Sequence, residues 1–296
     1  MTSAALIVNP RAGKGRAADQ AAQCAQVLNQ HGWHTRAFLC HSVTDTIESA
    51  RLATESDDVV IACGGDGTVN AVLQGVVGTS SALGVLPCGT GNDISSTLGM
   101  PKGDAEVIAK ALTSMPVISI DVARVTTADG ATRWYLGVLS TGFDSNVNER
   151  ANAIRWPRGT ARYITAMLAE LRTFTARPYS IAIDGAVHEG AGILVSVGNG
   201  PRYGGGMRIC PSADIRDGQL DLTWLGEVSK ATLLKVFPRV YTGTHVTHSQ
   251  VSTLRGKHIH VTAPGQIAYA DGERVGPLPI SVEVHPAALK VIAALA

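Results

Sequence analysis

A buried strand that runs directly into a glycine-rich turn constrains the fold of this chain more than any other feature. Residues 59–62 form a continuous apolar run, which is the pattern of a parallel strand covered on both faces. The sequence Gly-Gly-Asp-Gly-Thr follows at 64–68, and a helical pattern follows at 70–77. Because parallel strands are joined by crossovers that usually contain a helix, this arrangement predicts an α/β sheet.

The same alternation of strand and helix runs through the first 125 residues. It predicts a doubly wound α/β domain over 1–125. The expected strands cover residues 4–8, 35–39, 59–62 and 83–86, and the expected helices cover residues 17–31, 44–54 and 70–77.

The pattern changes after Pro116, where short strands joined by turns predominate. An amphipathic helix over 160–174 interrupts them, and Asp184-Gly185 is a hairpin signal. We therefore expect a mainly antiparallel β domain over 126–280. Its predicted strands cover residues 119–125, 134–140, 179–183, 192–197, 220–225, 257–263 and 280–284.

Composition limits the class of protein. The 25 Lys and Arg residues nearly balance the 24 Asp and Glu residues, which argues against a nucleic-acid partner because such partners usually need a strongly basic face. The five cysteines are scattered, with no zinc-ligand spacing, as in a reducing cytosol. A signal peptide and an apolar stretch of about 20 residues are both absent. We expect a cytoplasmic protein that is able to touch a membrane surface.

Glycine makes up 32 of the 296 residues, above the usual share of about 7%, and three glycine clusters follow predicted parallel strands. They cover residues 9–15, 64–68 and 87–93, at the strand ends where open α/β sheets bind ligands. Glycine lets the backbone approach a phosphate, and a following helix N-terminus offers it N–H groups. An ordinary glycine-rich turn is the plain alternative. Asp66 would repel a phosphate, which predicts a cation or a hydroxyl proton between the two groups.

None of these turns has Walker or dinucleotide-fingerprint spacing. Three segments, in their order along the chain, resemble the motifs of the diacylglycerol kinase catalytic family. They are Asn9-Pro10 with Gly13, residues 64–68 and residues 89–93. That family includes soluble bacterial lipid kinases and sphingosine kinases, and it is distantly similar to NAD kinases and phosphofructokinases. The resemblance covers nearly the whole chain, because 197–206, 211–222 and Asp271-Gly272-Glu273 are similar to its later motifs.

The resemblance implies an α/β nucleotide domain joined to a β-sandwich domain, with the active site in the cleft between them. Residues 281–296 would return to the first domain. ATP would contact Asn9, Pro10, Arg11, Ala12, Gly13, Gly64, Gly65, Asp66, Gly67, Thr68, Asn70 and Thr90.

The resemblance also implies catalytic and metal roles. Asp66 would act in the Mg²⁺–phosphate network, and Asp93 would be a second carboxylate there or near the acceptor hydroxyl. Glu273 would be the general base. A second cation would be held by Asp214, Asp217 and the backbone of Gln219.

The chain departs from the family pattern at three places, one of which is Asp214, where the family sometimes has a lysine. Asn92-Asp93 is followed by Ile-Ser-Ser, where the family often has Phe-Ala-Arg. The family has a nucleotide-contacting threonine around residues 40–42, but this chain has none there. We expect Ser42 to take the place of that threonine.

The implied activity is ATP- and Mg²⁺-dependent phosphorylation of a lipid primary hydroxyl, with diacylglycerol converted to phosphatidic acid. The alternatives are a sphingoid-base kinase, an NAD kinase-like enzyme and a catalytically inactive nucleotide-binding regulator. The lipid would be presented at a membrane surface, with peripheral contact at the inner face, and a homodimer is left open. A basic stretch predicts an anionic-lipid contact, with a solvated loop as the alternative; it contains Arg150, Arg155, Trp156, Arg158 and Arg162.

Overall fold

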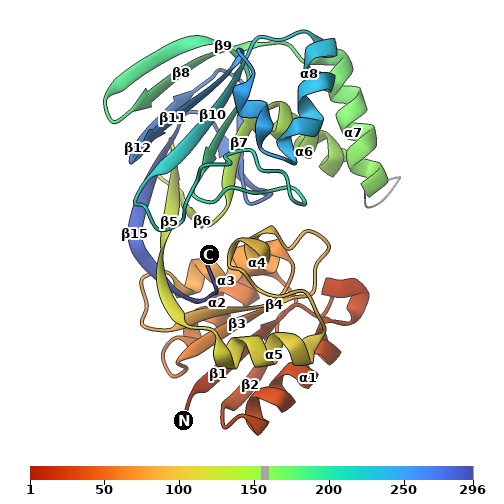
Figure 1. Ribbon diagram of the computed structural model, residues 1–296, viewed down its shortest axis with the longest axis vertical. Helices are drawn as coiled ribbons and strands as arrows, with labels where there is room; N and C mark the ends of the chain where they lie inside the picture. The colour runs from red at the N-terminus through yellow and green to blue at the C-terminus, as the bar shows by residue number, and fades with distance from the viewer. Residues whose placement is uncertain (155–159, 296) are drawn as a thin grey trace. The chain divides into compact units, whose positions relative to one another are not determined.

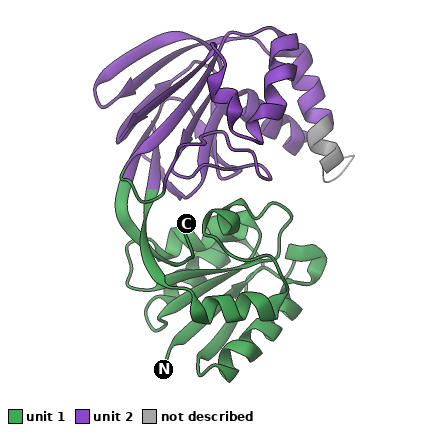
Figure 2. Ribbon diagram, in the orientation of Figure 1, with its two compact units in different colours: residues 1–122, 215–218, 285–296 green, residues 123–214, 219–284 purple. Residues whose placement is uncertain are grey.

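The computed structural model describes residues 1–154 and 160–295, and it describes the backbone alone for 160–164. The chain divides into two compact units (Figure 2). The first unit contains residues 1–122, 215–218 and 285–296, and the second contains 123–214 and 219–284.

A parallel sheet forms the centre of the first unit. Its strands lie in the order β2 (His34–Leu39), β1 (Ser3–Val8), β3 (Val59–Gly64) and β4 (Ala82–Pro87). Residues Lys290 and Val291 of β15 (Ile280–Ile292) extend it beside β4. Strand β3 is buried along its whole length, as expected for a strand covered on both faces.

Helices cover both faces of this sheet (Figure 1). The pair α1 and α5 pack together, and so do α2 and α3. The helices are α1 (Ala17–Gln30), α2 (Val43–Ala53), α3 (Asp66–Val76), α4 (Asp93–Thr97) and α5 (Ala105–Ser114), and the 3₁₀ helix η1 covers Ala12–Gly15.

The second unit is built mainly from antiparallel strands in the order β14-β13-β7-β9-β8-β12-β15, with β10 pairing both β9 and β11. Strands β5 and β15 belong in part to each unit. The predicted fold class, an α/β domain followed by an antiparallel β domain, is confirmed. The further strands are β5 (Val117–Thr127), β6 (Thr132–Tyr135), β7 (Val138–Gly142), β8 (Arg177–Ile183), β9 (Ala186–Gly198), β10 (Leu220–Gly226), β11 (Val251–Gly256), β12 (His258–Thr262), β13 (Ile267–Ala270) and β14 (Glu273–Pro277).

Two hydrophobic clusters fill the second unit. One lies between strands and contains Tyr135, Ile181, Val195 and Val282. The other includes Phe143 and Leu233, and Leu171 and Phe174 pack against it. It brings residues of the sheet together with residues of four helices, α6 (Phe143–Ala153), α7 (Thr160–Thr173), α8 (Lys230–Val236) and the 3₁₀ helix η2 (Phe237–Val240). A further 3₁₀ helix, η3, covers Thr244–Thr247.

Two elements differ from their predicted limits for identifiable reasons. Helix α3 begins at Asp66, four residues early, because the N–H groups of Thr68 and Val69 already donate to the Gly65 carbonyl. The predicted strand over 134–140 is two strands, β6 and β7. The N–H groups between them donate to the carboxylate of Asp271.

Several elements were not predicted: β11, β13, β14, α4, α5, α6 and α8. Helix α6 has the sequence Phe-Asp-Ser-Asn-Val-Asn-Glu-Arg-Ala-Asn-Ala, which has too few apolar residues to show helical periodicity. Among the described residues, no helix has the length and apolar character needed to cross a membrane.

Candidate active site

The loops after β3 and β4 touch through glycines. A Cβ atom on Gly89 would lie 2.6 Å from the Cα of Gly65, a separation that excludes any side chain. Asn92 closes the second loop: its Oδ1 accepts from the Gly89 N–H (3.1 Å), and its Nδ2 donates to the Gly89 carbonyl (2.9 Å). Glycine is therefore required at 89 by packing.

The loop after β1 joins the same edge of the sheet. Asn9 Nδ2 donates to Thr68 Oγ1 in α3 (3.4 Å), and Asn9 Oδ1 accepts from the Arg11 N–H (3.0 Å). Gly13 has φ +60, and a Cβ there would lie 3.0 Å from the Cys88 carbonyl oxygen. The structure thus brings together the three glycine clusters at the carboxyl ends of β1, β3 and β4.

Two carboxylates meet in this region. Asp66 begins α3, and its Oδ1 accepts from the Ile94 N–H (3.2 Å). A Cβ on Gly91 would lie 2.8 Å from Asp66 Oδ2 and 3.7 Å from Asp93 Oδ2, so both carboxylates border this glycine. Burial raises the pKa of Asp66, and the negative charge of Asp93 raises it further. The hydrogen bond from the Ile94 N–H lowers the pKa and so opposes this rise.

The donor set fits a magnesium ion that also binds phosphates. Mg²⁺ in nucleotide sites takes one or two carboxylates together with phosphate oxygens, and it would relieve the repulsion between Asp66 and Asp93. The exposed Gly67 lies in the first turn of α3, where free N–H groups favour an anion. Within residues 1–154 and 160–295, the structure contains no cluster of three or more His, Cys, Asp or Glu residues arranged to hold a metal.

The remaining residues predicted to contact ATP differ in their accessibility. Thr90 and Arg11 are exposed, whereas Pro10 and Ala12 are half-buried. Asn70 is fully buried on α3. Ser42, the expected substitute for a nucleotide-contacting threonine, caps α2 by accepting from the Asp45 N–H (3.1 Å).

Glu273 is the first residue of β14 in the second unit and is half-buried. The turn before it, Asp271-Gly272, has φ values of +49 and +82, typical of a two-residue hairpin turn. The Asp271 carboxylate accepts from the N–H groups of Leu136 (3.0 Å), Gly137 (2.9 Å) and Val138 (3.2 Å). Sequence reasoning assigned no role to Asp271, although its place in an Asp-Gly pair was a usable signal.

Helix α6 anchors the same hairpin. Glu149 Oε1 accepts from the Tyr269 hydroxyl (2.6 Å) and from Arg274 Nε (2.8 Å). Arg274 directly follows Glu273 in β14. Glu149 therefore holds both strands of the β13–β14 hairpin to one helix.

The loop predicted to hold a second cation divides between the units. Asp217 is exposed in the first unit, and Asp214 and Gln219 belong to the second. Asp121, a buried residue of β5, accepts from the Gly218 N–H (2.7 Å) and from the Ala287 N–H (2.8 Å). Sequence reasoning missed Asp121; a lone acid inside an apolar strand was the available signal.

Arg150, the first residue of the predicted basic stretch, forms an ion pair. Arg150 binds Glu170 of α7 through two nitrogens, at 2.9 and 3.1 Å, and also donates to Thr173. The Arg150 side chain is 42% exposed even in this ion pair, and the lipid contact of the basic stretch stays a prediction. Arg155, Trp156, Arg158 and the side chain of Arg162 lie outside the described residues.

Comparisons with known proteins match both the first and the second part of the chain. The family model described as the diacylglycerol kinase catalytic domain matches residues 3–125, and that described as the YegS C-terminal NAD kinase beta sandwich-like domain matches 137–293. "Diacylglycerol kinase" of Mycobacterium tuberculosis is 38% identical over 290 residues, covering 97% of this chain and 93% of the relative. "Probable lipid kinase YegS-like" of Klebsiella pneumoniae is 28% identical over 302 residues, covering 96% and 94%.

Two solved structures show the same fold. A diacylglycerol kinase from Bacillus anthracis matches with a TM-score of 0.73 and 24% identity, covering 99% of this chain and 97% of that chain. An NAD kinase from Archaeoglobus fulgidus in complex with ATP matches with a TM-score of 0.56 and 14% identity, covering 98% and 93%.

Proposed function

The chain belongs to the family of bacterial diacylglycerol kinases and YegS-like lipid kinases, and on that premise we propose that it transfers the γ-phosphate of ATP to the primary hydroxyl of diacylglycerol. The product would be phosphatidic acid. Family membership confirms the resemblance drawn from the glycine clusters. The observation that carries the proposal is the carboxylate pair of Asp66 and Asp93 beside Gly91, at the edge where three glycine loops meet.

The first unit would bind the nucleotide. Phosphoryl transfer depends mainly on positioning and on neutralising charge, and the backbone of the three loops supplies close approach and N–H donors. Asp66 and Asp93 would hold Mg²⁺ together with phosphate oxygens. When bound, Mg²⁺ neutralises charge that develops on the transferred group. The loop contacts of Asn9 and Asn92 would keep the backbone in place for binding.

Glu273 would supply the general base. Its carboxylate would take the proton from the lipid hydroxyl as that oxygen bonds to the γ-phosphorus and the bond to the ADP oxygen breaks. The support for this role is the motif match and the rigid turn before it, because Asp271 fixes the hairpin through three N–H groups. Asp214, Asp217 and the Gln219 backbone remain candidates for a second cation.

A lipid acceptor implies work at a membrane surface, so peripheral contact with the inner face is part of the proposal. The test is phosphate transfer from labelled ATP, with Mg²⁺, to diacylglycerol, to sphingosine, to NAD and with no acceptor. Labelled phosphatidic acid supports the proposal. A labelled sphingoid base or labelled NADP would mean that the acceptor is sphingosine or NAD and not diacylglycerol. Nucleotide binding without transfer to any acceptor would mean that the protein is a nucleotide-binding regulator and not an enzyme.

A matched pair of variants links the activity to the site. Asp66→Asn should abolish Mg²⁺-dependent transfer, because it removes a ligand charge from the carboxylate pair. Asp19→Asn is the control, since Asp19 is exposed on α1. Full activity in Asp66→Asn would remove this residue from the mechanism. Sedimentation of the same samples would decide whether the protein is a homodimer.

A further inference from the structure

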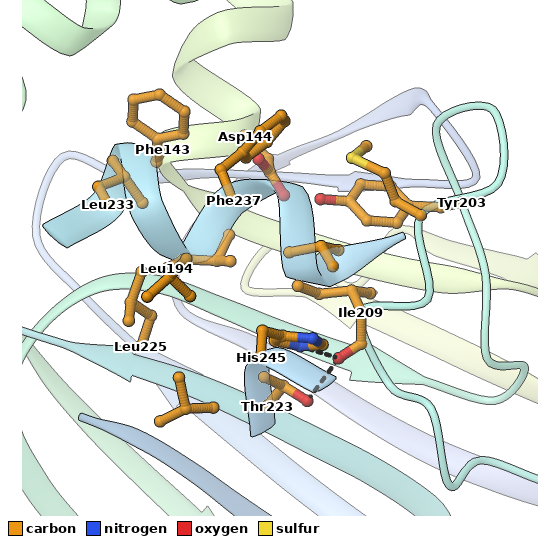
Figure 3. A pocket seen from close by; sticks show the side chains of 14 residues that line it. Phe143, Asp144, Leu194, Tyr203, Ile209, Thr223, Leu225, Leu233, Phe237 and His245 are labelled. Carbon is orange, nitrogen blue, oxygen red and sulfur yellow. Dashed lines mark hydrogen bonds between the residues drawn. The ribbon is translucent and has the colours of Figure 1, made fainter. Parts of the chain in front are cut away.

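Helix α8 and the 3₁₀ helix η2 follow each other without a break in the second unit, because the backbone angles at their junction are helical. The inner face of this helical segment is packed. Leu233, Val236, Phe237 and Val240 line a pocket that Asp144 of α6 also borders (Figure 3). Their spacing of three, one and three residues is that of one helix face, so this face is already used in the core of the second unit.

The outer face of the same segment also carries apolar side chains. Lys230, Leu234, Pro238 and Tyr241 are exposed, and their spacing of four, four and three residues places them along one side of the segment. Leu234 is 58% exposed and Tyr241 is 50% exposed. A helix that is packed on one face ordinarily presents polar residues on the other. Leu234 and Tyr241 therefore form an apolar strip without a function in the core.

Basic residues flank this apolar strip. Lys230 begins α8, and the exposed Lys235 and the half-buried Arg239 lie four residues apart on an adjoining side of the segment. The sequence has no Asp or Glu between Glu227 and Asp271. Since the whole chain is nearly neutral, with 25 basic and 24 acidic residues, the outer face concentrates positive charge that the composition conceals.

The hydrogen bonds of two of these basic residues do not neutralise their charge. Lys230 Nζ donates to the carbonyl of Arg172 in α7 (2.5 Å). Arg239 donates to the carbonyl of Thr244 and to the hydroxyl of Thr247 (both 2.7 Å). All three acceptors are uncharged groups, so these contacts fix the positions of the two cations and leave their charge for an anionic partner.

This combination fits the surface of an anionic membrane. A helix that lies in the membrane interface inserts its apolar side chains among the lipids, while lysine and arginine reach the phosphate groups. The amphipathic ring of tyrosine is typical of the headgroup level. A nucleic acid would also attract the basic side chains, but it would leave Leu234 and Pro238 exposed to water. The apolar strip therefore favours a lipid surface.

We propose that the outer face of residues 230–241 binds the surface of a membrane that contains anionic lipids. The inference rests on the proposed lipid-kinase function and names the face of the protein that meets the membrane. This face is separate from the predicted basic stretch, which begins at Arg150 in α6. Leu234 would insert at the level of the headgroups, and Lys230, Lys235 and Arg239 would attract lipid phosphates.

The test measures flotation of the full-length protein with lipid vesicles. One set of vesicles is phosphatidylcholine alone, and the other is an equal mixture of phosphatidylcholine and phosphatidylglycerol. The variants are Leu234→Ser and Lys235→Gln. Their matched controls are Leu52→Ser, at a leucine of α2 that is 57% exposed, and Lys102→Gln, at an exposed lysine of the first unit. All four substitutions are at exposed positions, and circular dichroism checks that each variant is folded.

We expect the wild type to bind the anionic vesicles more tightly than phosphatidylcholine alone. Leu234→Ser should weaken this binding about tenfold, because a half-exposed leucine no longer leaves water. Lys235→Gln should weaken it about fivefold, and this loss should shrink at high salt, which screens exposed charges. Both controls should bind as the wild type does.

Two results would overturn the proposal. The first is wild-type binding to anionic vesicles by both Leu234→Ser and Lys235→Gln. The second is unchanged vesicle binding by Lys235→Gln together with weaker binding to a single-stranded oligonucleotide, which would mean that the face binds nucleic acid.

Phosphate-transfer assays separate this inference from the function on which it rests. The acceptors are dioctanoylglycerol dissolved in buffer and a long-chain diacylglycerol in anionic vesicles. Leu234→Ser should keep the wild-type rate with the dissolved lipid and lose rate with the vesicles, whereas a folding defect would lower both. If the variants lose vesicle binding but the wild type phosphorylates no lipid, the kinase proposal fails and the membrane face stands. If the wild type and both variants phosphorylate the vesicle lipid equally, the kinase stands and the membrane face fails.

Discussion

Replacing Asp144 with asparagine should stabilise the protein at alkaline pH but much less at acidic pH. Burial raises the pKa of this carboxyl group from 3.8 to about 7, a rise of about three units. Each unit corresponds to about 1.36 kcal/mol, which gives about 4 kcal/mol. We therefore expect a penalty of about 4 kcal/mol for ionised Asp144 in the folded protein.

The sign follows from proton binding. Between pH 4 and 7, the folded protein keeps a proton on Asp144 that the unfolded chain has lost, so the free energy of unfolding falls as pH rises. The penalty is absent below the unfolded pKa, grows through this range and is complete above about pH 7. The asparagine variant has no such pH-dependent penalty, because its side chain does not titrate.

Urea unfolding at pH 5, 6, 7 and 8 measures the effect. The stability of Asp144→Asn relative to the wild type should increase by about 2–3 kcal/mol between pH 5 and pH 8. Glu227→Gln, at an exposed acid, should follow the wild type throughout. Parallel pH profiles for the wild type and Asp144→Asn would refute the reasoning, since they would mean that Asp144 titrates as in water.

Three further changes address the proposed site and its support. Glu273→Gln should lower kcat by about 10²–10⁴-fold with ATP affinity within twofold in a nucleotide titration; an unchanged kcat would remove the proposed base. Gly89→Ala should weaken ATP binding, because its Cβ would lie 2.6 Å from the Gly65 Cα and push the two loops apart; wild-type affinity in an equilibrium binding assay would contradict the loop assignment. Asp121→Ala should destabilise the protein by about 1.5–3 kcal/mol, because two main-chain N–H groups lose a charged acceptor; urea unfolding within 0.5 kcal/mol of the wild type (roughly the scatter expected for surface changes) would count against it.

The nucleotide-binding half of the candidate site was predictable because its elements are local. A buried strand, a glycine turn and a helix start lie within twelve residues at 59–70, so their order in the chain already places them together. Parallel pairing then brings the ends of β1, β3 and β4 to one edge. What the motif could not show is that Gly91 borders both Asp66 and Asp93, since that contact joins two different loops.

The second unit was less predictable because its elements depend on partners that lie far away in the sequence. Short antiparallel strands such as β13 and β14 are stabilised by partners across the sheet and carry little periodicity of their own. The hairpin turn at Asp184-Gly185 was found because its two residues determine its backbone locally. The ion pair of Arg150 was not predicted, because its partner, Glu170, lies on another helix.

The sequence by itself determined the α/β and antiparallel β classes, the three glycine clusters and the family, because these depend on residue order and local backbone preference. Only the tertiary structure showed Asp121 binding main-chain groups of residues 218 and 287, Asp271 fixing the turn before Glu273, and the Oδ2 atom of Asp144 shielded from solvent. The energy of a buried carboxylate depends on which N–H groups and apolar atoms surround it. Those neighbours come from distant parts of the chain, so they are known only once the chain has folded.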